Sequence, residues 1–390
     1  MVDFWIRVKQ LVIGKKGLAS IGIANVAGSV IGAVFWFYIA TVINPEQYGQ
    51  IHYFIAIAGM AQLLSLIAAP SVLTVYGAKN IKIHSTLFLI SLIAGLIASI
   101  VVFFLLSKVE VSLLIFGFIV FELANGLLLG RKLFSKYAKF FLAQKFLTLI
   151  LGVILYYSLG AEGILFALVL SYVPCIWIII KEFKENRIDF SLLKPRKGFL
   201  INNYGINIST AVGGQIDKLI IAPLLGFELL GNYSLAIQFL LILMILPNVV
   251  FKYLLAQDSS GENTKKLKEY TFLLSIGISI FGIIFLPKII PTFFPKFIEV
   301  IVAVQIISFV IVPRTVSLLY ESKFLALEKS KFVTVSKTTA AGISVIGFLI
   351  LGPIYGIVGL AISLVVAYIC STSFLVIIDK IIGKNVKENH

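Results

Sequence analysis

The sequence predicts an all-α polytopic membrane protein with about twelve transmembrane helices. Hydrophobic residues form 59% of the 390-residue chain, charged residues only 13%, and the mean hydropathy is +1.04. A soluble domain is typically about 45–50% apolar and about 25% charged, so this composition excludes an ordinary soluble enzyme. Apolar runs of roughly 20 residues, the length that a helix needs to cross a bilayer, recur along almost the whole chain.

The candidate helices are the apolar runs between clusters of charged and turn-forming residues. In chain order they are 18–43, 51–77, 85–106, 111–130, 140–159, 164–180, 199–222, 232–254, 270–287, 298–319, 333–352 and 357–378. These runs are too long and too uniformly apolar for the strands of a membrane barrel. Five prolines inside the runs are candidates for kinks: Pro70, Pro174, Pro223, Pro247 and Pro313.

The distribution of Lys and Arg predicts the orientation. Residues 1–17 are expected to form a basic interfacial segment rather than a cleavable signal. Of the 33 Lys and Arg residues, 25 fall in the termini and even-numbered loops, and Lys252 lies at the end of the eighth run on the same side, which makes 26. Only Lys108, Lys288 and Lys296 fall in odd-numbered loops. Basic loops stay on the cytoplasmic side, so both termini are predicted to be cytoplasmic in a multi-pass protein of the cell membrane. The same loops account for the net charge of +15, so nucleic acid is not an expected partner.

The second half of the chain repeats the first. One constant offset pairs Asn25 with Asn207, Gly32 with Gly214, Glu46 with Glu228, and Gly49 with Gly231. A second, slightly larger offset places Gly160-x-x-Gly163 on Gly356-x-x-Gly359. Six spans separate equivalent helices, which predicts a parallel repeat: a six-helix lobe at 1–190 and another at 191–390. Two lobes around a central cavity are the general plan of alternating-access transporters.

Polar residues inside the seventh run predict one wall of that cavity. Asn203, Asn207, Thr210, Gly214 and Asp217 follow one another at steps of three or four positions, so they share one helix face over about 21 Å. The opposite face is Ile, Leu, Val and Ala. The face is interpreted as a hydrated wall that binds substrate, and the alternative is polar contact with neighbouring helices.

Two further candidates accompany this face. Asn25 in the first run is the counterpart of Asn207 and is a second candidate for substrate contact. Lys218 follows Asp217 directly, and neighbours in sequence point in different directions on a helix, so the two need not pair. Lys218 either binds substrate or extends its ammonium group to the membrane interface.

Four charged residues inside other runs form a second candidate set. Glu122 and Lys145 correspond to Arg314 and Lys337 at a single constant offset. The first half therefore places an acid beside a base, where an ion pair is the structural alternative, and the second half has two bases. Glu321 is in reach of Arg314, but two like charges at one depth favour an anionic ligand such as a phosphate group.

The sequence predicts no enzyme, no cofactor and no metal site. It contains no nucleophile–base set, phosphate-binding loop or metal motif. Cys175 and Cys370 lie inside apolar runs, so a disulfide framework has no support. The external carboxylates are expected to cap helices: Glu46, Glu110, Glu162 and Glu228.

Four segments carry a resemblance to a known family. Residues 44–49 (NPEQYG), 215–236 (QIDKLIIAPLLGFELLGNYSLA), 325–331 (LALEKSK) and 352–368 (GPIYGIVGLAISLVVAY) resemble the Wzx-type polysaccharide flippases. These belong to the multidrug/oligosaccharidyl-lipid/polysaccharide (MOP) exporter superfamily. The resemblance covers nearly the whole chain. It implies two six-helix lobes, with the first, second, seventh and eighth spans lining the cavity.

The resemblance also implies a cargo and its partners. The expected function is to flip a polyprenyl-linked oligosaccharide from the cytoplasmic to the outer leaflet, for surface polysaccharide or glycan biosynthesis. Membrane lipid and glycosyltransferases of that pathway are the expected partners, and the chain is expected to be a monomer. A cation-coupled multidrug exporter of the same superfamily is one alternative. A membrane polysaccharide polymerase or ligase is another, although it would need a substantial outer loop with catalytic residues.

Overall fold

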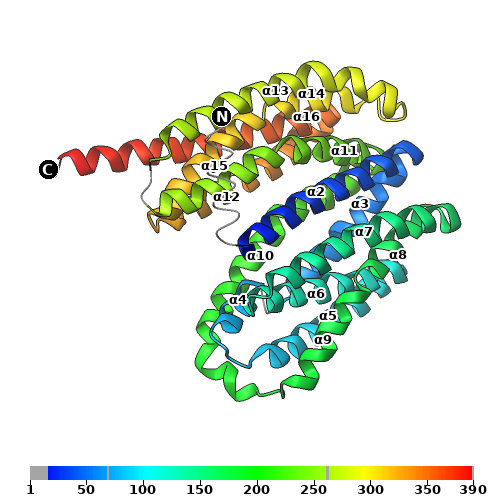
Figure 1. Ribbon diagram of the computed structural model, residues 1–390. Coiled ribbons are helices and arrows are strands. Elements are labelled where there is room, and N and C mark those ends of the chain that lie inside the picture. The colour runs from blue at the N-terminus through cyan, green and yellow to red at the C-terminus, as the bar shows by residue number, and fades with distance from the viewer. Residues whose placement is uncertain (1–15, 68–69, 261–262, 389–390) are drawn as a thin grey trace. The chain divides into compact units, whose positions relative to one another are not determined.

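The structure is a computed structural model that describes residues 16–67, 70–260 and 263–388. Every regular element among these residues is a helix, as Figure 1 shows. The chain forms two compact units. Unit 1 comprises Met1–Phe35 and Phe54–Gln215, and unit 2 comprises Trp36–Tyr53 and Ile216–His390. Each unit thus takes a segment from the other half of the sequence, and the division into lobes 1–190 and 191–390 stays a prediction.

Three helices contribute to both units: α2 (Lys16–Val42), α3 (Pro45–Ser65) and α10 (Lys197–Leu225). The other elements of unit 1 are α4 (Pro70–Ala78), α5 (His84–Leu106), α6 (Val109–Gly130), α7 (Phe134–Leu159), α8 (Ala161–Ser171), α9 (Val173–Glu185) and the 3₁₀ helix η1 (Phe190–Arg196). The other helices of unit 2 are α11 (Phe227–Leu243), α12 (Ile245–Ser259), α13 (Lys265–Phe293), α14 (Val300–Ser308), α15 (Ile311–Ala326) and α16 (Ser330–Glu388).

The fold is that of a multi-span membrane protein. By length and composition, eight helices of the described residues could cross a membrane, or ten if two bent pairs each form one span. The bent pairs are α3 with α4, at 43°, and α11 with α12, at 47°. This count is lower than the predicted twelve. It excludes α10, and it treats the stretch Ser330–Ile381 of α16 as one helix although Gly356 breaks its backbone.

The helix α6 lies at the centre of unit 1, where it contacts α4, α5, α7, α8 and α9. Most of its residues are apolar and buried, as expected for a helix enclosed by others. Glycines on α6 allow close packing against α4: a Cβ atom added to Gly130 would lie 2.8 Å from the carbonyl oxygen of Leu73. In unit 2 the consecutive helices α14 and α15 hold the equivalent place, with α11, α12, α13 and α16 around them.

The loop between α7 and α8 and the break in α16 have the same backbone geometry. Gly160 has φ 70° and ψ −150°, and Gly356, its counterpart in the repeat, has φ 57° and ψ −134°. Positive φ of this kind is accessible to glycine and strained for other residues. One helical turn further on, a side chain at Gly163 would collide with the carbonyl oxygen of Leu155, and one at Gly359 would collide with that of Leu351. Each glycine therefore lets its helix pack on the preceding one.

Two further contacts occur in both halves of the sequence. The Ser99 hydroxyl donates to the carbonyl of Ser112, and the Ser279 hydroxyl donates to that of Ser308, each at 2.8 Å. The first bond joins α5 to α6 and the second joins α13 to α14. Within unit 2, Gly49 of α3 and Gly231 of α11 face each other, and a side chain on either would collide with a backbone carbonyl of the other helix.

The four carboxylates that are expected to be external lie in the first turns of helices α3, α6, α8 and α11. A carboxylate there is favourable because the helix N-terminus carries a partial positive charge. These residues are Glu46, Glu110, Glu162 and Glu228.

Candidate functional site

The polar face of α10 begins with a contact inside unit 1. Asn203 accepts a hydrogen bond from the Ser71 hydroxyl of α4 at 3.2 Å, and its amide donates to the carbonyl of Phe199 at 2.9 Å. Asn207 and Thr210 fall within 206–213, outside the described side chains. At Gly214 an added Cβ atom would meet no described heavy atom within 4 Å. The face therefore combines one polar contact between helices with open space.

The matching face of α2 has the same two features. Asn25 accepts a hydrogen bond from the Tyr137 hydroxyl of α7 at 3.1 Å. Gly32, the counterpart of Gly214, likewise has no described heavy atom within 4 Å of an added Cβ atom. Gly28 differs, because a Cβ atom there would collide with the ring of Phe141. The two predicted asparagines that the structure describes thus contact neighbouring helices of unit 1.

Lys145 lies over an aromatic ring on α7. Its ammonium nitrogen is 5.6 Å from the ring centroid of Phe141, which is a cation–π distance. Glu122 on α6 is the opposite charge that acts on it. Within the described part of the chain, neither residue forms an ion pair shorter than 4.0 Å, so the expected Glu122–Lys145 contact is electrostatic rather than a bonded pair.

Asp217 and Lys218 pair with each other, although neighbours on a helix need not do so. The Lys218 ammonium lies 3.2 Å from one carboxylate oxygen of Asp217, and the Tyr233 hydroxyl donates to the other at 3.2 Å. Both charged side chains are partly buried, and the long lysine side chain turns back to reach its neighbour. The Lys218 ammonium is therefore engaged by its neighbour, and Asp217 is neutralised within unit 2.

Arg314 and Lys337 share one carboxylate. The Arg314 guanidinium donates to Oε1 of Glu321 at 2.6 Å, and the Lys337 ammonium lies 3.3 Å from Oε2. The Ser317 hydroxyl also donates to Oε1, at 3.1 Å. The Glu321 side chain is only 2% exposed, whereas that of Lys337 is 57% exposed. The predicted excess of two bases is thus reduced to one positive charge.

The two charged sets occupy corresponding places in the two units. Glu122 is within electrostatic range of the Tyr172 hydroxyl, and Arg314 lies 5.7 Å from the ring centroid of Tyr368, the counterpart of Tyr172 in the repeat. Glu321 has no acidic counterpart, because Leu129 stands at the matching position of the first half. One signal for Glu321 was in the sequence: it follows Arg314 by about two helical turns, on the same face.

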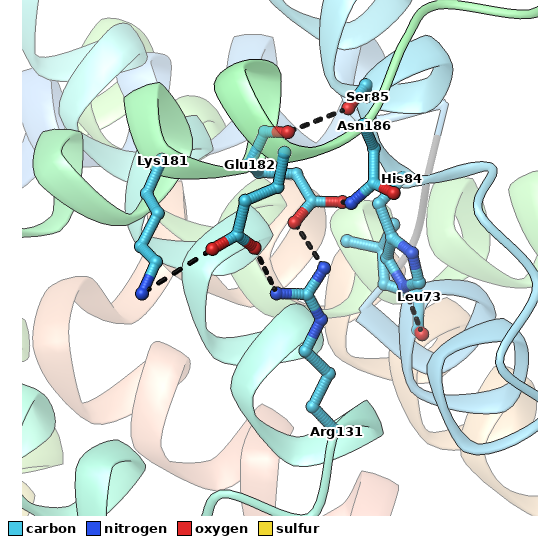
Figure 2. A network of polar contacts seen from close by, with 8 residues as sticks. Leu73, His84, Ser85, Arg131, Lys181, Glu182 and Asn186 are labelled. Carbon is cyan, nitrogen blue, oxygen red and sulfur yellow. Dashed lines mark hydrogen bonds and ion pairs between the residues drawn. The ribbon is translucent and has the colours of Figure 1, made fainter.

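A polar network at one end of unit 1 was not predicted as a site. Figure 2 shows Arg131, which follows the last residue of α6, close to Glu182 near the end of α9. Its guanidinium donates to Glu182 at 2.5 Å and to Glu185 at 3.3 Å. Glu182 also accepts from the Asn186 amide at 3.0 Å. From the sequence alone Arg131 is only a loop cation, because its carboxylate partners lie on a helix much later in the chain.

The segment after α9 is bound to the start of α5. The backbone N–H of Asp189 donates to the Thr86 hydroxyl at 2.8 Å, and the Ser85 hydroxyl donates to the carbonyl of Glu182 at 3.2 Å. Hydrogen bonds from the hydroxyl and the backbone N–H of Ser191 hold the pKa of Asp189 below its ordinary value. These bonds fix the connection between α9 and η1 on unit 1.

Among the described residues, no group of three or more His, Cys, Asp or Glu side chains could hold a metal ion. Cys175 is buried and Cys370 is exposed, and both are free thiols. The chemistry of the candidate site is therefore that of ionic and hydrogen-bonding side chains.

Comparison with known proteins gives the fold a family context. No family model and no curated protein matches the chain. Several solved structures, in contrast, match the chain over most of its length. A multidrug resistance MATE family transporter of the MOP superfamily, in an inward-facing conformation, matches with a TM-score of 0.71 at 14% identity, over 93% of this chain and 96% of that chain. The lipid II flippase MurJ, in an inward closed conformation, matches with a TM-score of 0.73 at 16% identity, over 92% and 87%.

A MOP superfamily transporter from Pyrococcus furiosus, described as having a binding pocket of reverse polarity, matches with a TM-score of 0.61 at 14% identity, over 96% of both chains. At these identities the likeness shows the fold alone. The chain therefore has the fold of MOP superfamily transporters, and the predicted all-α multi-span membrane fold is confirmed. The narrower Wzx-type resemblance stays a prediction.

Proposed function

We propose that this protein is a Wzx-type flippase that moves a polyprenyl-linked oligosaccharide from the cytoplasmic to the outer leaflet by alternating access. The cargo would serve surface polysaccharide or glycan biosynthesis. The fold supports a transporter, since the similar structures include a lipid II flippase and a multidrug transporter. The choice between a lipid-linked cargo and a drug rests on the charges inside the helices.

The excess of positive charge in the spans is the observation that carries the proposal. Glu122 is balanced by Lys145, and Asp217 is balanced by Lys218. Glu321 balances only one of its two cations, Arg314 and Lys337. A charge facing lipid at the bilayer centre costs at least about 2.5–3.5 kcal/mol, so the unbalanced cation is expected to face a polar ligand. An anionic diphosphate fits this charge, and an organic cation does not.

A span count of twelve is part of the proposal. To the ten candidate spans we add α10, which has 29 residues. We divide α16 at Gly356, because its 52-residue apolar stretch would be about 78 Å long if straight, against a bilayer core of about 30 Å. Twelve spans with a parallel repeat agree with the matching geometry at Gly160 and Gly356 and with the matching serine bonds.

The proposed orientation places both termini in the cytoplasm, as the positive loops predict. With the cell interior negative, outward movement of an anion is favoured by about 2.3 kcal/mol per charge per 100 mV. The sugar hydroxyls would exchange water for the amide and hydroxyl groups of α2 and α10, while the lipid tail stays in hydrocarbon. The proposed protein acts as a monomer alongside glycosyltransferases of the same pathway.

A binding measurement tests the choice of cargo. We expect the purified protein to bind a fluorescent polyprenyl-diphosphate oligosaccharide saturably, and Arg314→Gln to weaken that binding about tenfold, since a charge-assisted hydrogen bond contributes about 1.5–3 kcal/mol. Lys323→Gln is the matched control, because Lys323 pairs with Asp379 at a helix end. Saturable binding of ethidium without binding of the lipid-linked sugar would instead support the multidrug exporter.

A further inference from the structure

A small pocket lies at one end of unit 1, where α4 and α6 end and α5 begins. Its volume is about 150 Å³, and its polar lining consists of Asn80, Lys82, His84, Arg131 and Asn186. Figure 2 shows the last three of these side chains close together. Liquid water occupies roughly 30 Å³ per molecule, so the pocket has room for about five waters. It is therefore suited to a group of the size of a phosphate rather than to an oligosaccharide.

Hydrogen-bond donors in this lining remain unused. Among the described residues, no carboxylate lies within 4.0 Å of the Lys82 ammonium, and the Asn80 side chain has no hydrogen-bond partner. Asn80 also has a left-handed backbone, with φ 54°, that holds the loop in place. The Arg131 guanidinium has five N–H groups, and its bonds to Glu182 and Glu185 use two of them.

The nearby carboxylates are already engaged. Glu182 is buried and binds Arg131 and Asn186. Glu185 binds Arg131 and also Lys181, at 3.5 Å. The cations Arg131, Lys181 and Lys82 therefore exceed these two carboxylates by one charge, and that charge is on Lys82.

His84 lines the pocket, but one of its ring nitrogens is already engaged by the protein. The Nε2 atom of His84 is bonded to the carbonyl of Leu73 at 3.0 Å, so it is not free for a ligand in the pocket. The Lys82 ammonium, the Asn80 amide and the unused N–H groups of Arg131 are the donors available to such a ligand.

In unit 2, the segment that corresponds to the pocket contains a carboxylate side chain, that of Asp258. The offset that pairs Asn25 with Asn207 also pairs Lys82 with Thr264 and Tyr76 with Asp258. The Asp258 carboxylate accepts hydrogen bonds from Thr264 at 2.5 Å and from Ser322 at 2.6 Å, and it lies 2.8 Å from the Lys268 ammonium. At the position that matches Asp258, the first half of the chain has Tyr76, which carries no carboxylate. The anion that unit 2 provides from its own chain is therefore missing at the matching position of the first half.

The segment beside the pocket mixes apolar and basic side chains, as segments at a membrane interface do. The segment after α9, which is bound to Thr86, exposes the apolar side chains of Ile188 and Phe190 next to the cations Arg187 and Lys194. Apolar and basic side chains mixed in this way lie at the boundary between lipid headgroups and acyl chains. Basic pockets between helices at this depth bind phosphate headgroups.

We propose that this pocket is a phosphate site that takes the headgroup of an anionic phospholipid from the adjoining leaflet. The phosphate oxygens accept hydrogen bonds from the Lys82 ammonium, the Asn80 amide and the unused N–H groups of Arg131. Free phosphate shares this chemistry, and the exposed Ile188 and Phe190 favour the lipid as its source. The site is independent of the cargo, so it stands or falls separately from the proposed function.

The test is a lipid titration of the purified full-length protein in detergent, read by native mass spectrometry. The probes are phosphatidylglycerol, phosphatidylcholine and inorganic phosphate. We expect phosphatidylglycerol to bind more tightly than phosphatidylcholine, and Lys82→Ala to weaken its binding about tenfold, through loss of one charge-assisted hydrogen bond. Lys82→Arg retains the charge and should retain the binding. Lys139→Ala removes an exposed lysine of α7 that does not line the pocket, and it should change nothing.

Two results would overturn the proposal. Equal binding of phosphatidylglycerol to the Lys82→Ala and Lys139→Ala variants would remove the pocket from lipid binding. Saturable binding of inorganic phosphate, with no preference of the protein for phosphatidylglycerol over phosphatidylcholine, would assign the site to a soluble anion. Because the Lys82 side chain is exposed, the variant should elute and fold as the parent does, and Asn80→Ala provides an independent second variant.

Discussion

At the scale of residues, charges inside the helices are arranged in small balanced groups. Asp217 binds Lys218 and Tyr233, and Glu321 binds Arg314 and Lys337. Ionised groups in a low-dielectric interior are stable only with such partners. The pairing explains how a membrane helix tolerates them, and within the Glu321 group one of the two cations stays unbalanced.

The buried carboxylate of Glu321 should be important for stability. Glu321→Gln leaves two cations without their shared partner, so we expect a loss of about 3 kcal/mol, the lower end for a broken buried pair because Lys337 remains exposed. Asp379→Asn is the control: its partner Lys323 is largely exposed, and such surface pairs contribute about 0–1 kcal/mol. The apparent melting temperature in detergent should fall clearly for the first variant only. Equal shifts would mean that Glu321 is not the centre of this group.

Most of the charged members of the candidate site could be predicted from the sequence, but not their partners. The constant offset between the halves grouped Arg314 with Lys337, because it matches them to Glu122 and Lys145 on the equivalent helices of the first half. It did not reveal that Glu321 serves both, since the Lys337 contact comes from another helix. The Arg131–Glu182 pair was missed for the same reason.

At the scale of elements, the apolar runs predicted where the helices lie, but several helices extend beyond the ends of their runs. The run 85–106 corresponds to α5, His84–Leu106, but the run 270–287 corresponds to α13, which continues from Lys265 to Phe293. Polar end residues remain helical because backbone hydrogen bonds, not hydropathy, define a helix. Hydropathy marks only the part that lies in hydrocarbon.

Four of the five expected proline kinks coincide with helix breaks. A break lies within about one turn before Pro174, Pro247 and Pro313, and α4 begins at Pro70. Proline removes a backbone donor and its ring crowds the preceding turn, so the break falls upstream. Pro223 lies inside α10 without a break, near the end of the helix.

Glycine substitutions separate close packing from open space. Gly359→Ala would push a Cβ atom into the carbonyl of Leu351, and we expect it to destabilise the protein by about 1–3 kcal/mol, as overpacking does. Gly32→Ala meets no described atom, so it should be neutral or stabilising by up to about 1 kcal/mol, because alanine favours a helix. Thermal unfolding of the two variants measures the difference. Comparable destabilisation by both would show that the face of α2 at Gly32 is packed.

At the scale of the whole molecule, the fold combines two units with matching internal contacts. The glycine and serine contacts recur in both halves of the sequence, while the charges do not: Leu129 corresponds to Glu321, and Tyr76 corresponds to Asp258. A repeat preserves contacts that hold helices together. We infer that positions where the two halves differ in charge are positions where the halves differ in function.

Cysteine labelling checks the proposed orientation. After replacement of Cys175 and Cys370, a cysteine at Ser107, in the connection from α5 to α6, should react with an impermeant maleimide added to intact cells. A cysteine at Lys194, in η1, should react only after the membrane is opened. The reason is that 26 of the 33 basic residues are predicted to lie on one side of the membrane, and the side rich in Lys and Arg stays in the cytoplasm. Labelling of the Lys194→Cys variant in intact cells would contradict the proposed orientation and place η1 outside the cell.

The most direct measurement is translocation of a labelled polyprenyl-diphosphate oligosaccharide in liposomes that contain the purified protein, read by accessibility of the sugar to an external lectin. We predict protein-dependent movement of the sugar across the bilayer, and an imposed membrane potential should accelerate it. Asn207→Ala and Arg314→Ala should each lower the translocation rate at least about tenfold, because losing a bond worth about 1.4 kcal/mol or more lowers binding by that factor. Correctly folded protein that leaves the sugar where it started, or moves it equally well in both variants, would contradict the account.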